Sequence, residues 1–249
     1  MNTIDQLNRE FSAQEFPDEH PGVCTTDRFR ELAEGYARME NAIAVLSDLR
    51  SNVSHIYYGG FSKQLGLETP VREGTLPSIW EEEIFRLIHP DDLAGKHLQE
   101  LCFYHFIKKQ PRKRRAEYYL MSRLRMKGAT GSYLPVLHRM FYVSSEETLW
   151  LALCLYSPLV LDLPARCLIV NSVNGHTTEL EAQHRVQILS GREKQILTLI
   201  DKGMTSKEIA GMLCISVNTV SRHRQEILAR LQVKNSIEAC RMAKELKLL

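Results

Sequence analysis

The sequence has no long hydrophobic run. Its longest apolar stretch, around residues 149–156, suits a buried strand and falls well short of the ~18 residues that a membrane span needs. The first residues carry neither a basic segment nor an apolar core, so we expect no secretory signal and no membrane partner. With 44% hydrophobic and 25% charged residues, the composition predicts an ordinary soluble globular protein, and the unpaired cysteines predict that it is cytoplasmic.

Clustered cysteines and the short motifs of common enzymes are also missing. The six cysteines are widely spaced, with no CxxC pair, which predicts reduced core residues rather than a disulfide framework or a zinc site. The sequence contains no GxSxG, HExxH, P-loop or GxGxxG motif. We therefore expect no enzyme activity, no metal and no cofactor.

Basic charge is concentrated at one end of the chain. Residues 185–249 hold 12 lysine and arginine residues against 6 aspartate and glutamate residues, whereas the rest of the chain is net acidic. A basic domain on a slightly acidic body suggests that the C-terminal part meets a polyanion.

Four short helices are predicted in this basic part. Ser190 followed by Glu193 is a capping box that starts the first helix, and Gly203 ends it. Hydroxyl residues cap a second helix over 207–213 and a third that begins at Ser216. Because only about four residues join the second and third helices, the pair forms a helix-turn-helix. With a fourth helix, the expected core consists of Ile196, Leu197, Ile200, Ile209, Ala210, Leu213, Val217, Val220, Ile227, Leu228, Leu231, Ile237, Ala239, Ala243 and Leu246.

The third helix has one polar side. In a helix-turn-helix this helix lies in the major groove of DNA, with its N-terminal half toward the bases. Its exposed side carries donors and acceptors suited to base edges and phosphates, namely Asn218, Ser221, Arg222, Arg224 and Gln225. The expected partner is therefore double-stranded DNA.

The same region strongly resembles the LuxR-type helix-turn-helix family, also called the GerE or FixJ type. The resemblance rests on the ordered motifs Leu-Ser-x-Arg-Glu, Gly-x-Thr-Ser-Lys-Glu-Ile-Ala and Ile-Ser-x-Asn-Thr-Val-x-x-His-Arg, over about residues 189–249. It implies a tetra-helical fold and dimeric reading of inverted half-sites, with base-reading positions at Ser221, Arg222 and Gln225. Ser221 and Ser236 depart from the family, which often has lysine and arginine there. The implied DNA-backbone contacts are Thr205, Ser206, Lys207, Asn218, Thr219, His223, Arg224, Lys234 and Asn235.

The first 49 residues are predicted to be mainly helical. After a polar start, apolar residues recur every three or four positions from Phe29 to Leu46, which is the spacing of an amphipathic helix. Its apolar face would pack either on its own domain or on a second subunit.

Residues 50–165 are predicted to form an α+β domain. Strand-forming residues at 55–58 precede a glycine turn, and three longer segments, 116–126, 133–144 and 148–158, are joined by short polar connections. This pattern predicts an antiparallel meander. Helices are expected over 61–67, 79–88 and 93–109.

This order of elements resembles a PAS domain, which implies a sensor for a small molecule or a protein signal. The motif His89-Pro90-Asp91-Asp92 matches a turn of one PAS subgroup. We expect it to be a helix-capping turn with Asp91 or Asp92 at the N-cap, not a heme site. The basic run 112–115 would be a solvated loop or an accessory DNA contact. The aromatic residues expected either to fill the core or to line a pocket are Tyr118, Tyr119, Tyr133, Phe141, Tyr142, Trp150 and Tyr156.

The sequence therefore predicts a transcription regulator with a PAS-like sensor at 50–165, a linker at 166–186 and a DNA reader at 187–249. It would bind DNA as a homodimer, with RNA polymerase as a candidate further partner. The alternative is a polymerase- or partner-binding module of the sigma-region-4 type. Control by aspartyl phosphorylation is not expected, because the alternating βα pattern of a receiver domain is missing.

Overall fold

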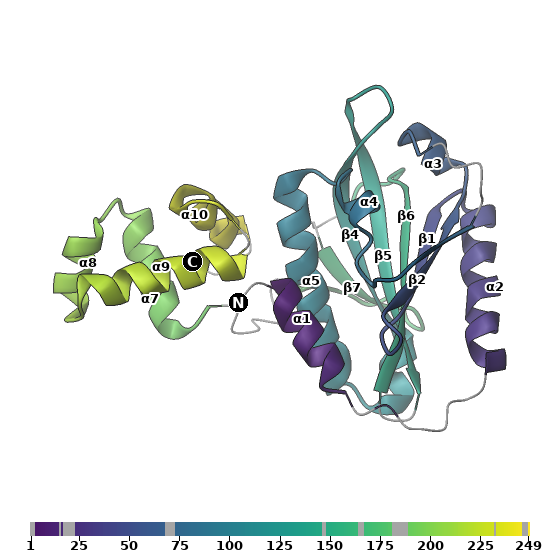
Figure 1. The fold of residues 1–249 in the computed structure, drawn as a ribbon, viewed down its shortest axis with the longest axis horizontal. Coiled ribbons are helices and arrows are strands. Elements are labelled where there is room, and N and C mark those ends of the chain that lie inside the picture. Colours follow the sequence, from purple (N-terminus) through teal and green to yellow (C-terminus); the bar gives the residue numbers. More distant parts are fainter. Residues whose placement is uncertain are drawn as a thin grey trace.

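The structure is a computed structural model. It describes residues 3–14, 16, 23–67, 73–145, 148–163, 167–180, 189–231, 233–245 and 249. A sheet domain flanked by helices and a smaller helical domain make up the chain (Figure 1), which confirms the predicted fold class of an α+β PAS-like domain followed by an all-α domain. No helix within these residues is both long and apolar enough to cross a bilayer.

An eight-stranded antiparallel sheet forms the larger domain. Its strands lie in the order β3-β2-β1-β6-β5-β4-β7-β8. The three longest, β4, β5 and β6, are consecutive neighbours, so the predicted meander is confirmed. The strands are β1 (Ile43–Asp48), β2 (Val53–Tyr58), β3 (Glu73–Leu76), β4 (Tyr118–Lys127), β5 (Tyr133–Ser145), β6 (Thr148–Pro158), β7 (Cys167–Asn171) and β8 (Thr177–Glu179).

Helices cover both faces of this sheet. In Figure 1, α1 and α5 lie on one face and α2 lies on the other. The central strand β6 is buried along nearly its whole length, because side chains on both of its faces meet a helical layer. The helices of this domain are α1 (Thr3–Ser12), α2 (Val23–Met39), α3 (Phe61–Gln64), α4 (Glu82–Phe85), α5 (Pro90–Lys109) and the 3-10 helix η1 (Arg112–Glu117).

The prediction of an amphipathic helix from Phe29 to Leu46 is wrong for the second half of this range. Helix α2 ends at Met39, Asn41 adopts a positive φ of 52°, and residues 43–48 form strand β1. The stretch from Ala42 to Leu46 is apolar at every position, so it satisfies a helical spacing while fitting a central strand that is buried on both faces. The sheet therefore begins before residue 50. It also extends through β7 and β8 into residues predicted as a linker.

The His89 motif is a helix-capping turn, but its N-cap residue was predicted wrongly. His89 itself is the N-cap of α5, and its Nδ1 accepts a hydrogen bond from the Asp91 backbone N–H at 3.2 Å. Pro90 takes the first helical position, where its fixed φ and missing N–H are tolerated. Asp92 lies three residues after the N-cap and instead binds the Arg125 guanidinium at 2.8 and 2.9 Å.

Two other expectations for this domain need correction. The run 112–115 is the 3-10 helix η1 rather than a fully solvated loop, because Arg115 is buried and donates hydrogen bonds to backbone carbonyls at the end of α5. Only residues 82–85 of the helix expected over 79–88 are helical. Of the aromatic residues on the meander, Tyr142, Trp150 and Tyr156 are buried, and Tyr142 lines a small cavity.

The C-terminal domain consists of four helices, as predicted. They are α7 (Gly191–Asp201), α8 (Ser206–Leu213), α9 (Val217–Leu231) and α10 (Ser236–Glu245). Most predicted core residues pack together, but Val217 and Ile237 are exposed, the latter by 84%. Each is the first or second residue of its helix and faces away from the other helices, while Cys240 and Met242 complete the core. Leu246 lies outside the described residues.

Glu81 makes the stability of the sheet domain depend on pH. Its carboxyl is buried, which raises its pKa from 4.5 to about 7 even though Lys96 opposes the shift. A raised carboxyl pKa favours the folded state at low pH, and this contribution is lost as the pH rises from about 4.5 to about 7. Glu81→Gln should therefore raise the free energy of unfolding by about 1–3 kcal/mol more at pH 8 than at pH 5.

Urea unfolding followed by the fluorescence of the two tryptophans, both in this domain, measures this difference. Glu82→Gln is the matched control, because the neighbouring Glu82 side chain is largely exposed. Equal effects of the Glu81 substitution at the two pH values would contradict the buried, protonated carboxyl.

Candidate nucleic-acid interface

Capping interactions fix the ends of the helix-turn-helix. Ser190 and Glu193 form the predicted capping box at the start of α7, and Thr205 with Glu208 forms a second one at the start of α8. The turn after α8 passes through Cys214, which has a left-handed φ of 52°. These local bonds satisfy backbone groups that would otherwise lack partners at the helix ends.

Helix α9 begins directly after this turn. The Ser216 hydroxyl accepts a hydrogen bond from the Thr219 backbone N–H at 3.0 Å, so the predicted cap is present. Val220, Ile227 and Leu231 are buried against the other helices. This burial fixes the rotation of α9 about its own axis and so decides which of its side chains face solvent.

The opposite side of α9 is polar and open. Asn218, Ser221, Arg222 and Gln225 are all exposed, and their spacing of three and four residues places them on one side of the helix. The three residues predicted to read bases thus lie together on a surface that the sheet domain leaves uncovered. Arg222 forms an exposed ion pair with Glu226 at 3.5 Å, and such exposed pairs are weak.

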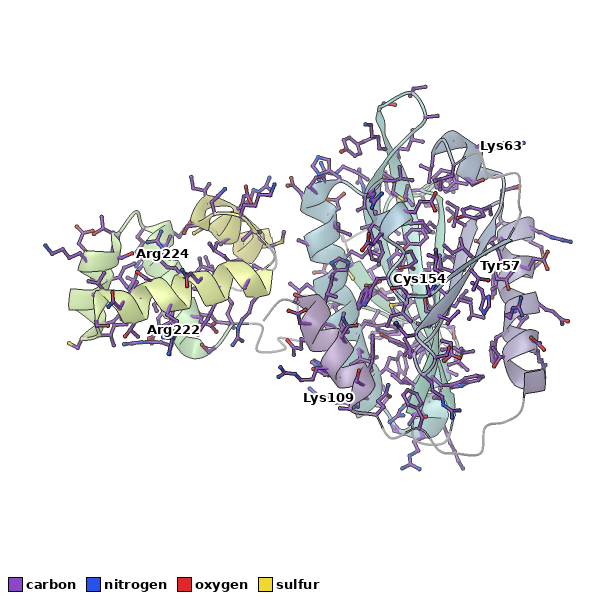
Figure 2. The ribbon with its side chains drawn as sticks, in the orientation of Figure 1. Tyr57, Lys63, Lys109, Cys154, Arg222 and Arg224 are labelled. Atoms are coloured by element: carbon purple, nitrogen blue, oxygen red, sulfur yellow. The ribbon has the colours of Figure 1, made fainter. Side chains whose placement is uncertain are left out.

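Arg224 lies on the other side of α9 and has a different environment (Figure 2). Its guanidinium donates hydrogen bonds to the hydroxyls of Ser206 and Ser236, each at 3.0 Å. Arg224 therefore joins α8, α9 and α10. His223 is half-buried, with its ring Nδ1 3.2 Å from a carboxylate oxygen of Glu226.

The remaining predicted backbone contacts lie at helix N-termini. Thr205, Ser206 and Lys207 stand at the start of α8, and Lys234 and Asn235 stand just before α10. Asn235 accepts a hydrogen bond from the Glu238 backbone N–H at 2.9 Å and so caps α10. Helix N-termini present backbone N–H groups and a positive dipole end, which suit a phosphate.

The sequence did not predict the contacts between the two domains. The Thr3 hydroxyl of α1 donates to the Arg230 backbone carbonyl of α9 at 2.9 Å, and Arg241 of α10 pairs with Asp91 of α5 at 2.7 Å. Thr3 and Arg230 are separated by 227 residues, so no local pattern could have revealed them. These contacts lie away from the exposed polar side of α9.

A helix-turn-helix whose second helix is buried on one side and polar on the other defines a DNA-binding domain of the tetra-helical type. Comparison with known proteins agrees, since residues 187–243 match the family described as "Bacterial regulatory proteins, luxR family". The chain thus carries a C-terminal helix-turn-helix domain of the luxR family. The description of that family names regulatory proteins of bacteria.

Curated relatives match in the same region. "Oxygen regulatory protein NreC" of Staphylococcus haemolyticus is 39% identical over 74 residues, covering 30% of this chain and 34% of the relative. The protein of the same name from Staphylococcus carnosus is 46% identical over 63 residues, covering 25% of this chain and 29% of the relative. The match spans about a third of the length of these relatives, so it describes their shared domain and not the whole proteins.

A solved phage VqmA–DPO complex matches more of the chain but far more distantly. It is 16% identical, covers 88% of this chain and 89% of the solved chain, and has a TM-score of 0.31. So distant a likeness informs neither the fold nor the function.

Substitutions of Arg222 and Arg224 should differ in their effect on the stability of the C-terminal domain. Arg224→Ala removes two hydrogen bonds from a charged group that links three helices, so we expect it to lower the stability of the C-terminal domain by about 1–3 kcal/mol. Arg222→Ala should change it by no more than about 0.5 kcal/mol, because the side chain is exposed. Amide hydrogen exchange of α9 in the full chain measures both effects, and equal protection in the two variants would contradict the structural role of Arg224.

Proposed function

We propose that the chain is a sequence-specific, double-stranded-DNA-binding transcription regulator that binds as a homodimer with α9 in the major groove. The observation that carries the proposal is the exposed polar side of α9, fixed in orientation by the burial of its opposite side. Ser221, Arg222 and Gln225 would read bases. Arginine binds guanine through two parallel hydrogen bonds, and glutamine binds adenine in the same manner.

Contacts to the DNA backbone would come from the helix N-termini that meet near Arg224. Its guanidinium bonds both Ser206 at the start of α8 and Ser236 at the start of α10, with Lys207 and Lys234 close to these residues in sequence. Asn218 and Thr219 add polar groups at the start of α9, next to His223. Arg224 would contact phosphate only by giving up a bond to Ser206 or Ser236, so its first role is to hold the helices together.

We further propose that the PAS-like domain controls the DNA reader. Support comes from two polar contacts between the domains, Thr3 with the Arg230 carbonyl and Asp91 with Arg241. A signal that favours one arrangement of α1 and α5 would alter both contacts. It would thereby change how the two readers of a dimer are presented to DNA, provided that the signal binds one arrangement better than the other.

Replacing Arg222 tests the base-reading surface. Arg222→Ala should weaken binding to the cognate site by about 1–3 kcal/mol, because a bidentate base contact is lost. Binding to unrelated duplex DNA should change little. Cognate sites selected from a random duplex library, followed by affinity measurements at fixed salt, provide the comparison.

Two variants calibrate this test. Lys207→Ala should weaken binding to cognate and unrelated duplexes alike, as expected of a phosphate contact. Lys202→Ala, an exposed lysine at the C-terminal end of α7, should change neither. If Arg222→Ala lost equal affinity for the cognate and the unrelated duplex, this would argue against base reading. If the wild-type protein bound no duplex at low salt, a partner-binding module would be the better description.

The spacing of half-sites tests the dimer. Two α9 helices related by a two-fold axis would enter major grooves one turn apart, about 34 Å or 10 base pairs. Inserting about 5 base pairs at the centre of the selected site places the half-sites on opposite faces of the duplex. We therefore expect the affinity to fall to that of a single half-site, and unchanged affinity would contradict dimeric reading.

A further inference from the structure

Basic side chains gather where α5 ends and η1 begins. Six of the seventeen residues from 101 to 117 are lysine or arginine, and one is acidic. Outside this segment, residues 1–184 carry more acidic than basic side chains, so the positive charge is local. Five of the six cations are exposed and together form the basic surface: Lys108 and Lys109 in α5, and Arg112, Lys113 and Arg114 in η1.

The sixth cation, Arg115, fixes the backbone beneath this surface. It is buried, and its guanidinium donates hydrogen bonds to the carbonyls of Lys108 and Gln110, each at 3.4 Å. On the other side of η1, the Ser172 backbone N–H in the turn after β7 donates to the Glu117 carbonyl at 2.7 Å. Because η1 is bonded on both sides, its cations and those of α5 keep a fixed relation to one another.

The acidic residue of this segment does not cancel the charge. The Glu117 carboxylate accepts hydrogen bonds from Arg114 at 3.1 Å and from the side-chain amide of Asn171 at 3.2 Å, so it is already engaged at the edge of the basic surface. Lys109 and Lys113 form no ion pair with an acidic residue in the part of the chain that the structure describes. Their charges are therefore open to a partner in solution.

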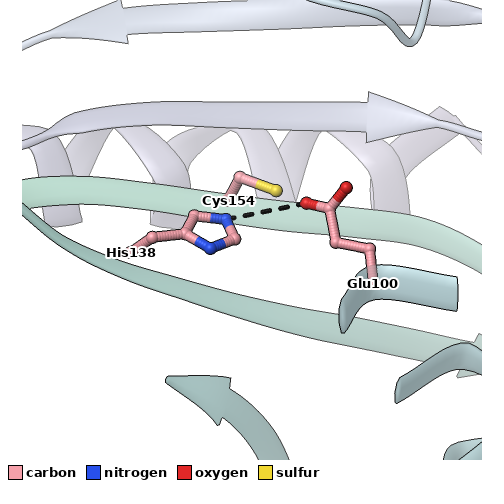
Figure 3. A group of neighbouring side chains, drawn as sticks. All are labelled: Glu100, His138 and Cys154. Atoms are coloured by element: carbon pink, nitrogen blue, oxygen red, sulfur yellow. Dashed lines mark ion pairs between the residues drawn. The ribbon is translucent and has the colours of Figure 1, made fainter. Parts of the chain in front are cut away.

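Glu100, which precedes the basic surface in α5, is turned into the interior. Its carboxylate accepts a hydrogen bond from Lys96 at 2.6 Å, and both side chains are buried. Figure 3 shows Glu100 beside His138 and Cys154, with Nε2 of His138 3.8 Å from a carboxylate oxygen of Glu100. This carboxylate is thus paired inside the domain and cannot offset the exposed cations at the end of the same helix.

Two helices connect the basic surface with the C-terminal domain. Asp91, at the start of α5, pairs with α10 at 2.7 Å, and the 20 residues of α5 span about 30 Å. At one end of α1 Thr3 contacts α9, and near the other end Glu10 lies 2.6 Å from His105, one helical turn before Lys109. The ten residues of α1 span about 15 Å. The basic surface therefore lies about 15–30 Å from the contacts with α9 and α10.

A DNA duplex offers phosphates at such a distance. It carries one negative charge for about every 1.7 Å of its axis, and one helical turn is about 34 Å long. A duplex on the exposed side of α9 would thus present backbone phosphates within about one turn of the half-site that α9 would read. Figure 2 shows Lys109 on the side of the sheet domain that faces the C-terminal domain, whereas Lys63 lies on the far side.

We propose that the basic surface is a second DNA contact, which binds the phosphate backbone beside the half-site read by α9. Lysine and arginine bind phosphates without regard to base sequence, so this contact would add affinity but no specificity. The inference rests on the proposed function, because its ligand is the duplex that α9 holds. It gives the sheet domain a direct part in DNA binding, separate from any control that it exerts.

Neutralising the two lysines without ion pairs tests the contact. In the full chain, Lys109→Gln combined with Lys113→Gln should weaken binding to cognate and unrelated duplexes alike, by about tenfold at about 50 mM salt. The slope of log affinity against log salt concentration should fall by about 2 for each bound protomer, because two phosphate contacts are lost. Fluorescence anisotropy with labelled duplexes of about 40 base pairs measures both quantities.

The matched control removes two charges from the opposite end of the sheet. Lys63 and Lys127 are exposed, and the ten residues of β4 place Lys127 about 33 Å from η1. Lys63→Gln combined with Lys127→Gln should change the affinity less than about twofold and leave the salt slope unchanged.

The outcomes separate this inference from the proposed function. If the wild-type protein binds duplex DNA and the Lys109 and Lys113 double variant matches it, or matches the control variant, this inference alone is overturned. Weaker binding of the double variant to phosphatidylglycerol vesicles, with unchanged binding to DNA, would also overturn it. If the wild-type protein binds no duplex, the proposed function fails and this inference fails with it.

Discussion

The C-terminal domain depends on α9 being buried along one side and exposed along the other. Val220, Ile227 and Leu231 hold that helix against its neighbours, so Arg222 and Gln225 have no choice but to face outward. The proposed base recognition needs this rigidity, because each hydrogen bond to a base edge tolerates little displacement. The capping bonds at the helix termini add to this rigidity, since they prevent the helices from fraying or rotating.

Arg224 shows how one residue type serves different purposes two positions apart. Arg222 and Arg224 stand two residues apart in the same helix, and a helix turns by about 200° between them. One guanidinium therefore faces solvent, and the other reaches Ser206 and Ser236. The serine at 236, where the related family often has arginine, supplies the hydroxyl that this arrangement uses. The departure from the family pattern thus coincides with an added bond between helices.

Local patterns predicted much of this molecule, and their failures have a common physical cause. The capping box of Ser190 and Glu193, the glycine after α7 and the three long strands of the meander each depend on residues close in sequence, and all are present. Strand β1 was missed because Ala42 to Leu46 is apolar throughout. Such a run fits both the 3.6-residue period of a helix and the two-residue period of a strand. His89 at the N-cap was missed because aspartate is the more common N-cap residue, whereas Pro90 favours the first helical position and so places the cap at residue 89.

Local sequence patterns could not predict which side chains meet in the interior of the sheet domain. Lys96 and Glu100 stand four residues apart in α5, which is the spacing of an ordinary surface ion pair. Only the tertiary structure shows that α1 and the β-sheet enclose them, and that β5 brings Tyr142 to the same place. Burying such a pair is costly unless its geometry and partners compensate. Helix α1, which covers this pair, also contacts α9 through Thr3, so the buried interior of the sheet domain and the helix-turn-helix domain are linked by one helix.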